Sequence, residues 1–359
     1  MGKEEITIVG AGDAIIDREQ PETMFRHVKD VFQSADITYV NMEQVLSDKG
    51  TPHPRQAVHA SSDIVNAYTK NSIDVVSLAT NHIMDWGVEG LYGTLETLDR
   101  ANIAHCGAGR NIAEARKPAI LERNGTRVGF LNFCTVAFEE FNATEDKPGL
   151  SSLKVYTAYE HVDYQPATPP LIVSITKKED LAVLTDCVAA LKSEVDVVVV
   201  CMHWGQHILP AIIPDYCFEM AYAAVDAGAD VIFGSHTHIL KGIEVYKGKP
   251  IFYSLGNFCL ELGAHMRDHK HVNKLDKLYR VKDWHDRRKT MIAKIIIENG
   301  QLKRASYLPC YERDDKEPEL VKRPDPRAQE IFDYVVEIGK EEGIETGFEW
   351  DGDEVVVIL

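Results

Sequence analysis

Short runs of apolar, mostly β-branched residues recur along the chain and are separated by more polar sequence. Runs that are continuously apolar are typical of strands in a sheet covered on both faces. Residues 87–102 and 216–229 instead repeat their apolar positions with helical spacing. Strand-like and helix-like segments therefore alternate, which predicts βαβ units and a largely parallel sheet in an α/β protein. The strand-like runs are 5–12, 35–43, 73–82, 127–133, 195–204, 229–238 and 249–258.

Two regions depart from this alternation. Residues 138–180 contain the loop-rich stretches EEFNATEDKPGL and DYQPATPP, which predict an insertion near the sheet edge or a lid over the site. After residue 264 a basic stretch precedes a hairpin with Asn299 and Gly300 at its turn. We expect this part of the chain to finish a second sheet and to end on a helix near residues 326–343.

Composition narrows the class of protein. The chain has 359 residues, of which 45% are hydrophobic and 26% charged, as in globular proteins with a large core. A net charge of -17 argues against a nucleic-acid or anionic-membrane binder, because such a surface repels phosphate. No apolar stretch follows the N-terminal charges and no segment has the length to cross a bilayer, so we predict a cytoplasmic protein. The seven cysteines are widely spaced without a CxxC pair, which indicates reduced core thiols.

Polar side chains that can bind metals follow nearly every strand-like run. In an open α/β sheet the carboxyl ends of the strands form the ligand crevice, so these side chains should converge at one end of a central sheet. The candidates are Asp13, Glu43, Asn81, His82, His203, His236 and His238.

Carboxylates, an amide and imidazoles form a mixed oxygen and nitrogen set, which suits Zn, Mn or Fe and differs from the all-oxygen cages of calcium. Such a set can hold one or two divalent ions, and paired ions generate hydroxide and clamp a reacting group, which is the chemistry of hydrolysis. Taken singly, Asp13 is as consistent with a turn or helix cap, and His82 with a buried core histidine. His236 and His238 are a stronger pair, because alternate strand residues share a face.

Further candidates surround this set. Asp85 either caps a helix or orients His82 as a catalytic partner. The GxG in CGAGRN lacks the spacing of a dinucleotide site. Candidate substrate-binding residues are Arg18, His207, Tyr253 and Asn257, although Tyr253 and Asn257 equally fit a packed strand end. The basic stretch contains histidines that indicate a solvated loop rather than a second metal site, namely His265, His269 and His271.

The motifs occur in a recognisable order: GD at 12–13, NME at 41–43, TNHxxDxG at 80–87, GAG at 107–109, HWG at 203–205, GSHTH at 234–238 and YSLGNF at 253–258. This series resembles the CapA-type poly-gamma-glutamate capsule-biosynthesis family, a branch of the calcineurin-like metallophosphatase superfamily. The resemblance implies a four-layer α/β/β/α metallophosphatase-like sandwich. It also implies a catalytic domain over residues 1–310 and a C-terminal extension over residues 311–359 that ends in a helix and packs on the same domain.

The resemblance also implies roles for the site residues. Asp13 and His238 would bind one metal, and Glu43 would bridge to a second metal. The second metal would be bound by Asn81, His203 and His236. His82 would protonate the leaving group or stabilise its charge.

The chain departs from the family pattern at three positions. The superfamily opens with Asp-x-His, whereas Asp13 is followed here by Ala14 and Ile15, so one metal site has fewer ligands. His207 stands where the HWG motif is usually followed by a glutamate, and Thr80 replaces the common asparagine before Asn81. The last two changes touch the pocket edge and bear on the substrate. We also expect the chain to have no signal or anchor, which would separate it from membrane-associated capsule proteins.

Together these patterns predict a metal-dependent hydrolase that uses a metal-bound hydroxide on an ester or amide. The substrate is expected to be small or peptide-like and can be anionic, without nucleic-acid or membrane partners. The competing hypothesis is a non-catalytic binding or assembly protein of the capsule-biosynthesis type that retains the fold. The metal, the bond cleaved and the oligomeric state stay open.

Overall fold

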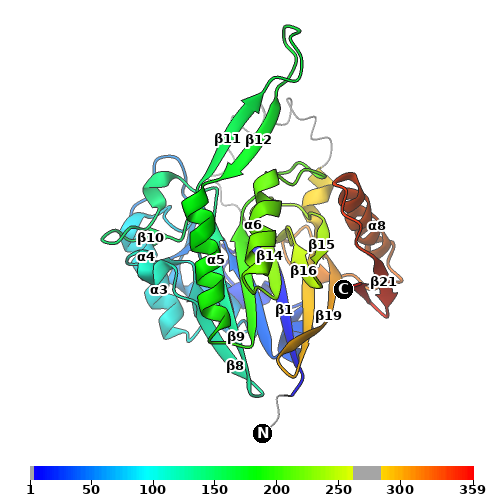
Figure 1. Ribbon diagram of the computed structural model, residues 1–359. Coiled ribbons are helices and arrows are strands. Elements are labelled where there is room, and N and C mark those ends of the chain that lie inside the picture. The colour runs from blue at the N-terminus through cyan, green and yellow to red at the C-terminus, as the bar shows by residue number, and fades with distance from the viewer. Residues whose placement is uncertain (1–3, 262–283) are drawn as a thin grey trace.

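The computed structural model describes residues 4–261 and 284–359 and contains two large β-sheets (Figure 1). The first sheet joins strands from both ends of the chain in the order β21-β22-β19-β18-β1-β2-β5-β6, with β17 beside β1 and β20 beside β19. Its strands are β1 (Ile6–Ile15), β2 (Ile37–Met42), β5 (Val75–Ser77), β6 (Ala104–Cys106), β17 (Asn257–Leu260), β18 (Lys289–Glu298), β19 (Gln301–Glu312), β20 (Pro318–Leu320), β21 (Phe348–Asp351) and β22 (Glu354–Val357).

The second sheet comes from the middle of the chain, in the order β15-β16-β14-β13-β9-β8. Its central strands run parallel and its two edge strands, β8 and β15, run antiparallel to their neighbours. The strands are β8 (Ala119–Arg123), β9 (Thr126–Cys134), β13 (Val197–His203), β14 (Val231–Ser235), β15 (Ile243–Tyr246) and β16 (Lys249–Phe252).

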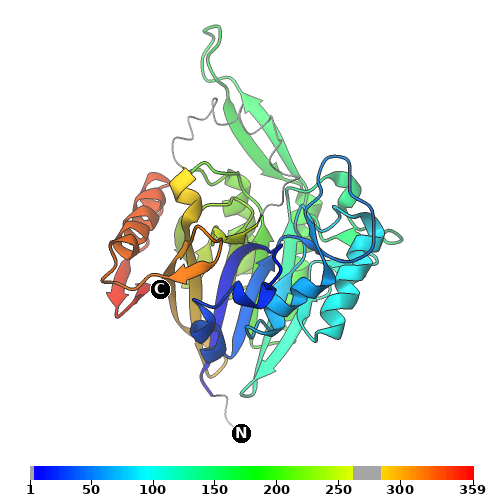
Figure 2. The same ribbon diagram turned by 180° about the vertical axis from the view of Figure 1, so that it is seen from behind.

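Three buried layers of side chains separate four layers of secondary structure. Ile8 and Tyr39 of the first sheet meet Phe130 and Phe233 of the second sheet in the core between the sheets. Helices α1 (Lys29–Ser34), α2 (Val65–Thr69) and α3 (Gly87–Arg100) cover the outer face of the first sheet (Figure 2). Helices α5 (Lys178–Lys192) and α6 (Asp215–Asp226) cover the second sheet. The predicted α/β/β/α sandwich is therefore confirmed.

The predicted parallel pairing holds for β1, β2, β5 and β6 in the first sheet and for β9, β13, β14 and β16 in the second, but not for the strands after β17. The hairpin of β18 and β19 turns at Asn299 and Gly300, with φ of 56° and 77°, as a two-residue hairpin turn requires. However, β18 pairs antiparallel with β1 and so extends the first sheet. Strand-like runs that resemble each other in sequence are divided between two sheets, because the choice of neighbour depends on long-range pairing rather than on local apolar patterning.

The predicted C-terminal helix is α8 (Pro326–Glu341), whose N-terminus is capped by the Asp325 side chain. Ile331 and Val335 of α8 pack into the core between the sheets, so the helix closes one side of the sandwich. The helix is not the last element, however, because β21 and β22 follow, and β22 pairs with β19 while β21 pairs with β22. The described chain therefore ends in a hairpin. Val355 and Val357 alternate along β22 and are both buried against the core.

Residues 138–180 are more ordered than their loop-rich sequence predicts. They contain β10 (Gly149–Leu150), which pairs with β7 (Ala108–Gly109), and the two-stranded hairpin of β11 (Val155–Glu160) and β12 (Leu171–Thr176). The hairpin stands away from the sandwich (Figure 1). The short remaining elements are α4 (Ile112–Ala115), β3 (Val45–Leu46), β4 (His59–Ala60), η1 (Pro21–Thr23), η2 (Ser62–Ile64), η3 (Glu139–Phe141) and η5 (Trp284–Arg288).

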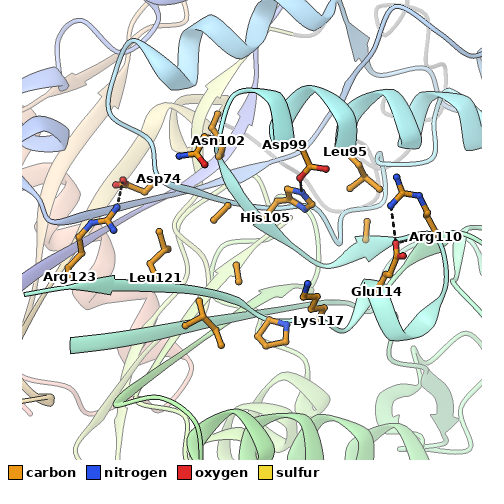
Figure 3. Close-up of a pocket in the computed structure, with 16 residues that line it drawn as sticks. Asp74, Leu95, Asp99, Asn102, His105, Arg110, Glu114, Lys117, Leu121 and Arg123 are labelled. Carbon is orange, nitrogen blue, oxygen red and sulfur yellow. Dashed lines mark hydrogen bonds and ion pairs between the residues drawn. The ribbon is translucent and has the colours of Figure 1, made fainter. Parts of the chain in front are cut away.

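A pocket of about 670 Å³ lies where edge strands β6 and β8 face each other (Figure 3). Charged side chains that line it pair with one another, as in Arg123 with Asp74 at 2.9 Å and His105 with Asp99 at 3.1 Å. No predicted site residue lines this pocket. The predicted histidines His265, His269 and His271 lie outside the described residues, and no helix within the described ranges is long and apolar enough to span a bilayer.

Candidate metal centre

The predicted metal ligands meet where the carboxyl ends of strands from both sheets approach each other. Asp13 lies on β1, Glu43 directly follows β2, and Asn81 follows β5 in the first sheet. In the second sheet His203 is the last residue of β13, and His236 directly follows β14. The site thus lies between two sheets rather than at one end of a single sheet.

The two histidines after β14 have unusual backbone conformations. His236 and His238 have φ of 87° and 59°, in the left-handed region that non-glycine residues rarely occupy. Each such residue costs about 1–3 kcal/mol, so surrounding contacts must hold it in place. One such contact is the His236 N–H, which donates to Asp13 Oδ2 at 3.1 Å. Backbone strain at this turn brings both imidazoles to the strand ends.

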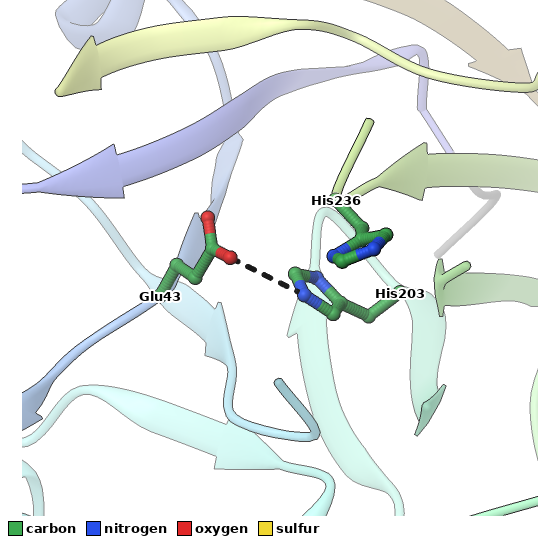
Figure 4. Close-up of side chains that lie close together, drawn as sticks. All are labelled: Glu43, His203 and His236. Carbon is green, nitrogen blue, oxygen red and sulfur yellow. Dashed lines mark ion pairs between the residues drawn. The ribbon is translucent and has the colours of Figure 1, made fainter. Parts of the chain in front are cut away.

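The first group of ligand atoms belongs to Glu43, His203 and His236, and these atoms lie within 4.8 Å of one another (Figure 4). Oε1 of Glu43 lies 3.4 Å from Nε2 of His203. Oδ1 of Asn81 approaches the same nitrogen to 2.7 Å. All four side chains are buried, with at most 6% of the residue surface exposed.

The second ring nitrogen of His203, Nδ1, contacts Ser235, and this contact bears on which nitrogen carries the proton. Nδ1 of His203 lies 2.9 Å from Oγ of Ser235, and that hydroxyl donates to the carbonyl oxygen of Met202 at 3.3 Å. When the Ser235 proton is used in this bond, Nδ1 of His203 is the donor to Ser235. Burial lowers the pKa of His203 to about 4, so the ring is neutral at neutral pH and carries a single proton. In the tautomer protonated at Nδ1, the lone pair of Nε2 faces the oxygens of Asn81 and Glu43.

The second group comprises Asp13, Glu43 and His238. Nδ1 of His238 lies 3.6 Å from Asp13 Oδ2 and 3.9 Å from Glu43 Oε2. Asn41 donates from Nδ2 to Asp13 Oδ1 at 2.7 Å, which fixes the carboxylate. Glu43 belongs to both groups, so it lies between the two sets of potential ligands.

Unpaired buried atoms test whether this arrangement fits a metal. Both carboxylate oxygens of Glu43 and Nδ1 of His236 are buried and have no hydrogen-bond partner within residues 4–261 and 284–359. A buried polar atom without a partner is costly, and a buried carboxylate more so. A divalent cation would satisfy the carboxylate oxygens and the imidazole lone pairs together, so these residues fit a metal.

Electrostatics agree with this assignment. Burial raises the pKa of Glu43 to about 7, against the opposite effect of His82. Burial and then the neighbouring Glu43 raise the pKa of Asp13 well above its usual range. Two buried carboxylates without a cation thus resist ionisation, whereas a divalent cation would favour their charged forms.

His82 lies beside the two groups without belonging to either. Its Nδ1 is 2.7 Å from Asp85 Oδ2, and its Nε2 points toward the centre, 4.0 Å from Glu43 Oε1. Burial disfavours the charged ring, but the hydrogen bond and charge of Asp85 prevail and raise the pKa of His82. Asp85 is itself held by the N–H of Val58 at 2.8 Å. His82 is therefore oriented to carry a proton next to the two groups of potential ligands.

The other predicted substrate-binding residues have different surroundings. The exposed His207 ring lies over His236, with 4.0 Å between ring centroids, and Asn257 Oδ1 lies 2.8 Å from His238 Nδ1. Both residues therefore lie beside the potential ligands.

Arg18 and Tyr253 are directed elsewhere. Arg18 pairs with Glu261 at 2.8 Å and Glu317 at 2.7 Å. The buried Tyr253 donates its hydroxyl to Glu244 at 2.7 Å. The structure does not bring these two side chains into the ligand cluster.

Sequence reasoning missed three supporting residues. Asn41 stands two positions before Glu43, so strand alternation places it on the same face. Ser235 precedes His236 in the GSHTH motif and supports His203 instead. Gln56, with its amide oriented to donate, lies 3.2 Å from Asp85 Oδ1, and no local sequence signal marks it. Ile15 occupies the position of the histidine in the superfamily pattern Asp-x-His, and it packs with Val58 and Leu260.

The fold is a metallophosphatase-like α/β/β/α sandwich, and the potential metal ligands lie between its two sheets. Residues 7–261 match the family described as "Bacterial capsule synthesis protein PGA_cap". The match covers most of the chain, so the chain belongs to this family, and the predicted CapA-type resemblance is confirmed.

Two curated relatives carry the CapA name. The PGA biosynthesis protein CapA of Bacillus subtilis is 29% identical over 255 residues, covering 70% of this chain and 60% of the relative. The capsule biosynthesis protein CapA of Bacillus anthracis is 30% identical over 273 residues, covering 72% and 61%. The chain thus spans about three fifths of the length of these relatives.

Among solved structures, a hypothetical protein from Thermus thermophilus is similar to this chain with a TM-score of 0.50. The match has 13% sequence identity and covers 86% of this chain and all of that protein. At this identity the similarity concerns the fold alone.

Proposed function

We propose that the protein is a metal-dependent hydrolase. The observation that carries the proposal is the buried Glu43 carboxylate, whose two oxygens lack hydrogen-bond partners in the described structure and which belongs to two groups of potential ligands. Such a carboxylate is unfavourable in a purely structural role. It is favourable as a metal ligand.

One or two divalent ions are proposed to bind here. Asp13, Glu43 and His238 would hold one ion, and Glu43 with Asn81, His203 and His236 the other. The oxygen and nitrogen donors suit Mn, Zn or Fe. When bound, such ions polarise a substrate oxygen and lower the pKa of a water ligand toward neutrality.

The chain itself supplies the proton. His82 is proposed to donate a proton from Nε2 to the leaving oxygen or nitrogen of the substrate. Asp85 accepts from Nδ1, which keeps the opposite nitrogen facing the centre and favours the protonated ring. His207 and Asn257, which contact the histidines after β14, are proposed to border the substrate.

The proposed substrate is a small or peptide-like ester or amide with an anionic group. A cation centre attracts an anionic group, whereas the net charge of -17 disfavours nucleic acid. We include phosphoesters among the proposed substrates because of the metallophosphatase-like fold. We include amides, such as glutamyl compounds, because two relatives are named for capsule or PGA biosynthesis.

The first test measures metal content and turnover in purified protein. We expect near-stoichiometric Mn, Zn or Fe in the wild type, a large loss in Glu43→Gln, and no loss in the control His105→Ala, whose histidine pairs with Asp99 away from the centre. Wild type should hydrolyse para-nitrophenyl phosphate, bis-para-nitrophenyl phosphate or γ-glutamyl para-nitroanilide.

Two results would contradict the proposal. A wild type that stays free of metal after incubation with each ion rejects the metal centre. A metal-loaded wild type that turns over no ester or amide in a broad panel rejects the hydrolase and favours a binding or assembly protein.

A further inference from the structure

Asp13 lies next to a β-bulge in β1. The pairing register of β1 with β2 shifts between Ala11 and Asp13, which leaves Gly12 as an extra residue and places Asp13 beside Asn41. Side chains alternate along a regular strand, and an extra residue moves the next side chain to the opposite face. A Cβ atom at Gly12 would lie 2.0 Å from the carbonyl oxygen of Gly256, so the bulge requires glycine. The bulge therefore puts Asp13 on the same face of the sheet as Asn41.

A row of buried polar side chains crosses three neighbouring strands from this point. Asn41 of β2 lies beside Asp13 of β1 and beside Ser77 of β5 in the pairing register. Tyr39 stands two positions before Asn41 and so shares its face, and the Tyr39 ring stacks on aromatic rings of the second sheet. At most 1% of the surface of each of these four residues is exposed. The row is therefore shielded from water between the two sheets.

Hydrogen bonds join the four side chains in one direction. Asn41 Nδ2 donates to Asp13 Oδ1 at 2.7 Å, which turns the amide oxygen of Asn41 toward Ser77. Ser77 Oγ donates to that oxygen at 2.6 Å. Tyr39 Oη lies 2.7 Å from Ser77 Oγ, and when the Ser77 proton is used toward Asn41, the Tyr39 hydroxyl is the donor in this contact. All three bonds then point toward the Asp13 carboxylate.

We propose that Ser77 and Tyr39 are positioning residues that act through Asn41 on Asp13 as a metal ligand. The inference rests on the proposed function, because it concerns one of the two proposed ion sites. A hydrogen bond to a carboxylate favours its charged form, which is the form that binds a cation. Bonds aligned in a chain also strengthen one another. The row holds Oδ1 of Asp13, while Oδ2 lies 3.6 Å from Nδ1 of His238, another potential ligand.

A structural role alone does not explain a polar row at this place. Other residues of these three strands that face the second sheet are apolar, such as Ile8, Ile37 and Val75. Replacing both partners of a buried hydrogen bond by apolar groups of the same shape can be nearly neutral in stability. The sheet could therefore be packed here without polar groups. The polar row lies where the sheet reaches the potential ligands.

The test is a titration of the full chain, freed of metal, with Co²⁺, followed by visible absorption, which reports both affinity and the geometry around the ion. We expect Ser77→Ala to bind at least one Co²⁺ about 10- to 100-fold more weakly than wild type, with shifted absorption bands. Ser77→Thr keeps the hydroxyl and should restore both readouts. The control Ser306→Ala changes a buried serine on β19 of the same sheet and should match wild type.

A second variant, Tyr39→Phe, removes only the last hydroxyl of the row, and we expect a smaller loss of Co²⁺ affinity. Circular dichroism should be unchanged in each variant. Wild-type Co²⁺ affinity in folded Ser77→Ala would overturn the inference, as would a Ser77→Thr variant that binds as weakly as Ser77→Ala. If Ser77→Ala does not fold, wild-type affinity in Tyr39→Phe would overturn it.

Failure of the inference can be told apart from failure of the proposed function. A wild type that binds no divalent metal would overturn the proposed metal centre and this inference together. A wild type that binds Co²⁺ with the same affinity and absorption bands as its folded Ser77→Ala variant would overturn this inference alone. Neither comparison depends on turnover of a substrate.

Discussion

Oδ1 of Asn81 lies 2.7 Å from Nε2 of His203, although the two residues are 122 positions apart and follow strands of different sheets. With the ring proton of His203 on Nδ1 and donated to Ser235, an amide oxygen and a bare nitrogen face each other. Two acceptors at this distance repel unless a cation lies between them. Burial keeps the ring neutral, so in this tautomer Nε2 can bind a cation.

Ser235→Ala should weaken metal binding. The variant removes the acceptor that holds Nδ1–H of His203, so both tautomers become available and the ring is less well oriented. Loss of such a supporting hydrogen bond costs about 10- to 100-fold in metal affinity. Titration calorimetry with Zn²⁺ or Mn²⁺ measures the change. Ser306→Ala, a buried serine on β19, is the control, and equal affinities in the two variants would contradict the role of Ser235.

Asp85→Asn should impair turnover while leaving the bound metal in place. The carboxylate raises the pKa of His82, so its removal lowers that pKa and shortens the pH range in which the ring holds a proton. We expect kcat to fall by about 10²-fold or more, and activity to decline at lower pH than in wild type. Asp74→Asn, which changes an ion pair with Arg123, should retain the wild-type profile. An unchanged pH profile in Asp85→Asn would reject His82 as the proton donor.

Tyr253→Phe should change stability rather than substrate binding. The Tyr253 hydroxyl donates to Glu244 Oε2 in a buried setting. Removing it should lower the free energy of unfolding by about 1–2 kcal/mol, as measured by urea denaturation. The KM for any substrate should be unaffected. A raised KM with unchanged stability would instead support the sequence-based prediction that Tyr253 binds substrate.

Lys241→Met should remove a pH dependence of stability. The buried ammonium donates to the carbonyl oxygens of Leu209, Pro210 and Ile212, and burial lowers the pKa of Lys241 to about 7. An unfolded lysine has a pKa of about 10.4, so between pH 7 and 10 the unfolded chain binds more protons than the folded chain. Stability attributable to Lys241 therefore rises with pH across this window.

The measurement is urea denaturation of wild type and Lys241→Met at pH 7, 8 and 9. The free energy of unfolding of wild type, minus that of the variant, should increase by about 1 kcal/mol for each pH unit. Groups that titrate in both proteins contribute equally to the two values, so their effects cancel in this difference. A constant difference would show that the three carbonyls keep the ammonium charged in the folded chain.

Much of the candidate metal centre could be predicted from local sequence. Asp13, Glu43 and His203 each stand at or just after the carboxyl end of an apolar run, and the ends of such strands meet in an α/β fold. Asn299 and Gly300 marked a hairpin turn because both adopt the positive φ that such a turn needs. These features depend on neighbours in sequence, so the sequence by itself determined them.

Only the tertiary structure decided which strands pair and where individual side chains point. The β18 strand lies beside β1 because of long-range backbone pairing, which apolar patterning does not specify. Arg18 joins Glu261 and Glu317 because loops distant in sequence meet, and Tyr253 turns to Glu244 because its strand register places it there. The β11–β12 hairpin forms within residues 138–180, although two stretches of this segment have the composition of a loop. The physical reason is the same in each case, because contacts between distant segments carry no local sequence signal.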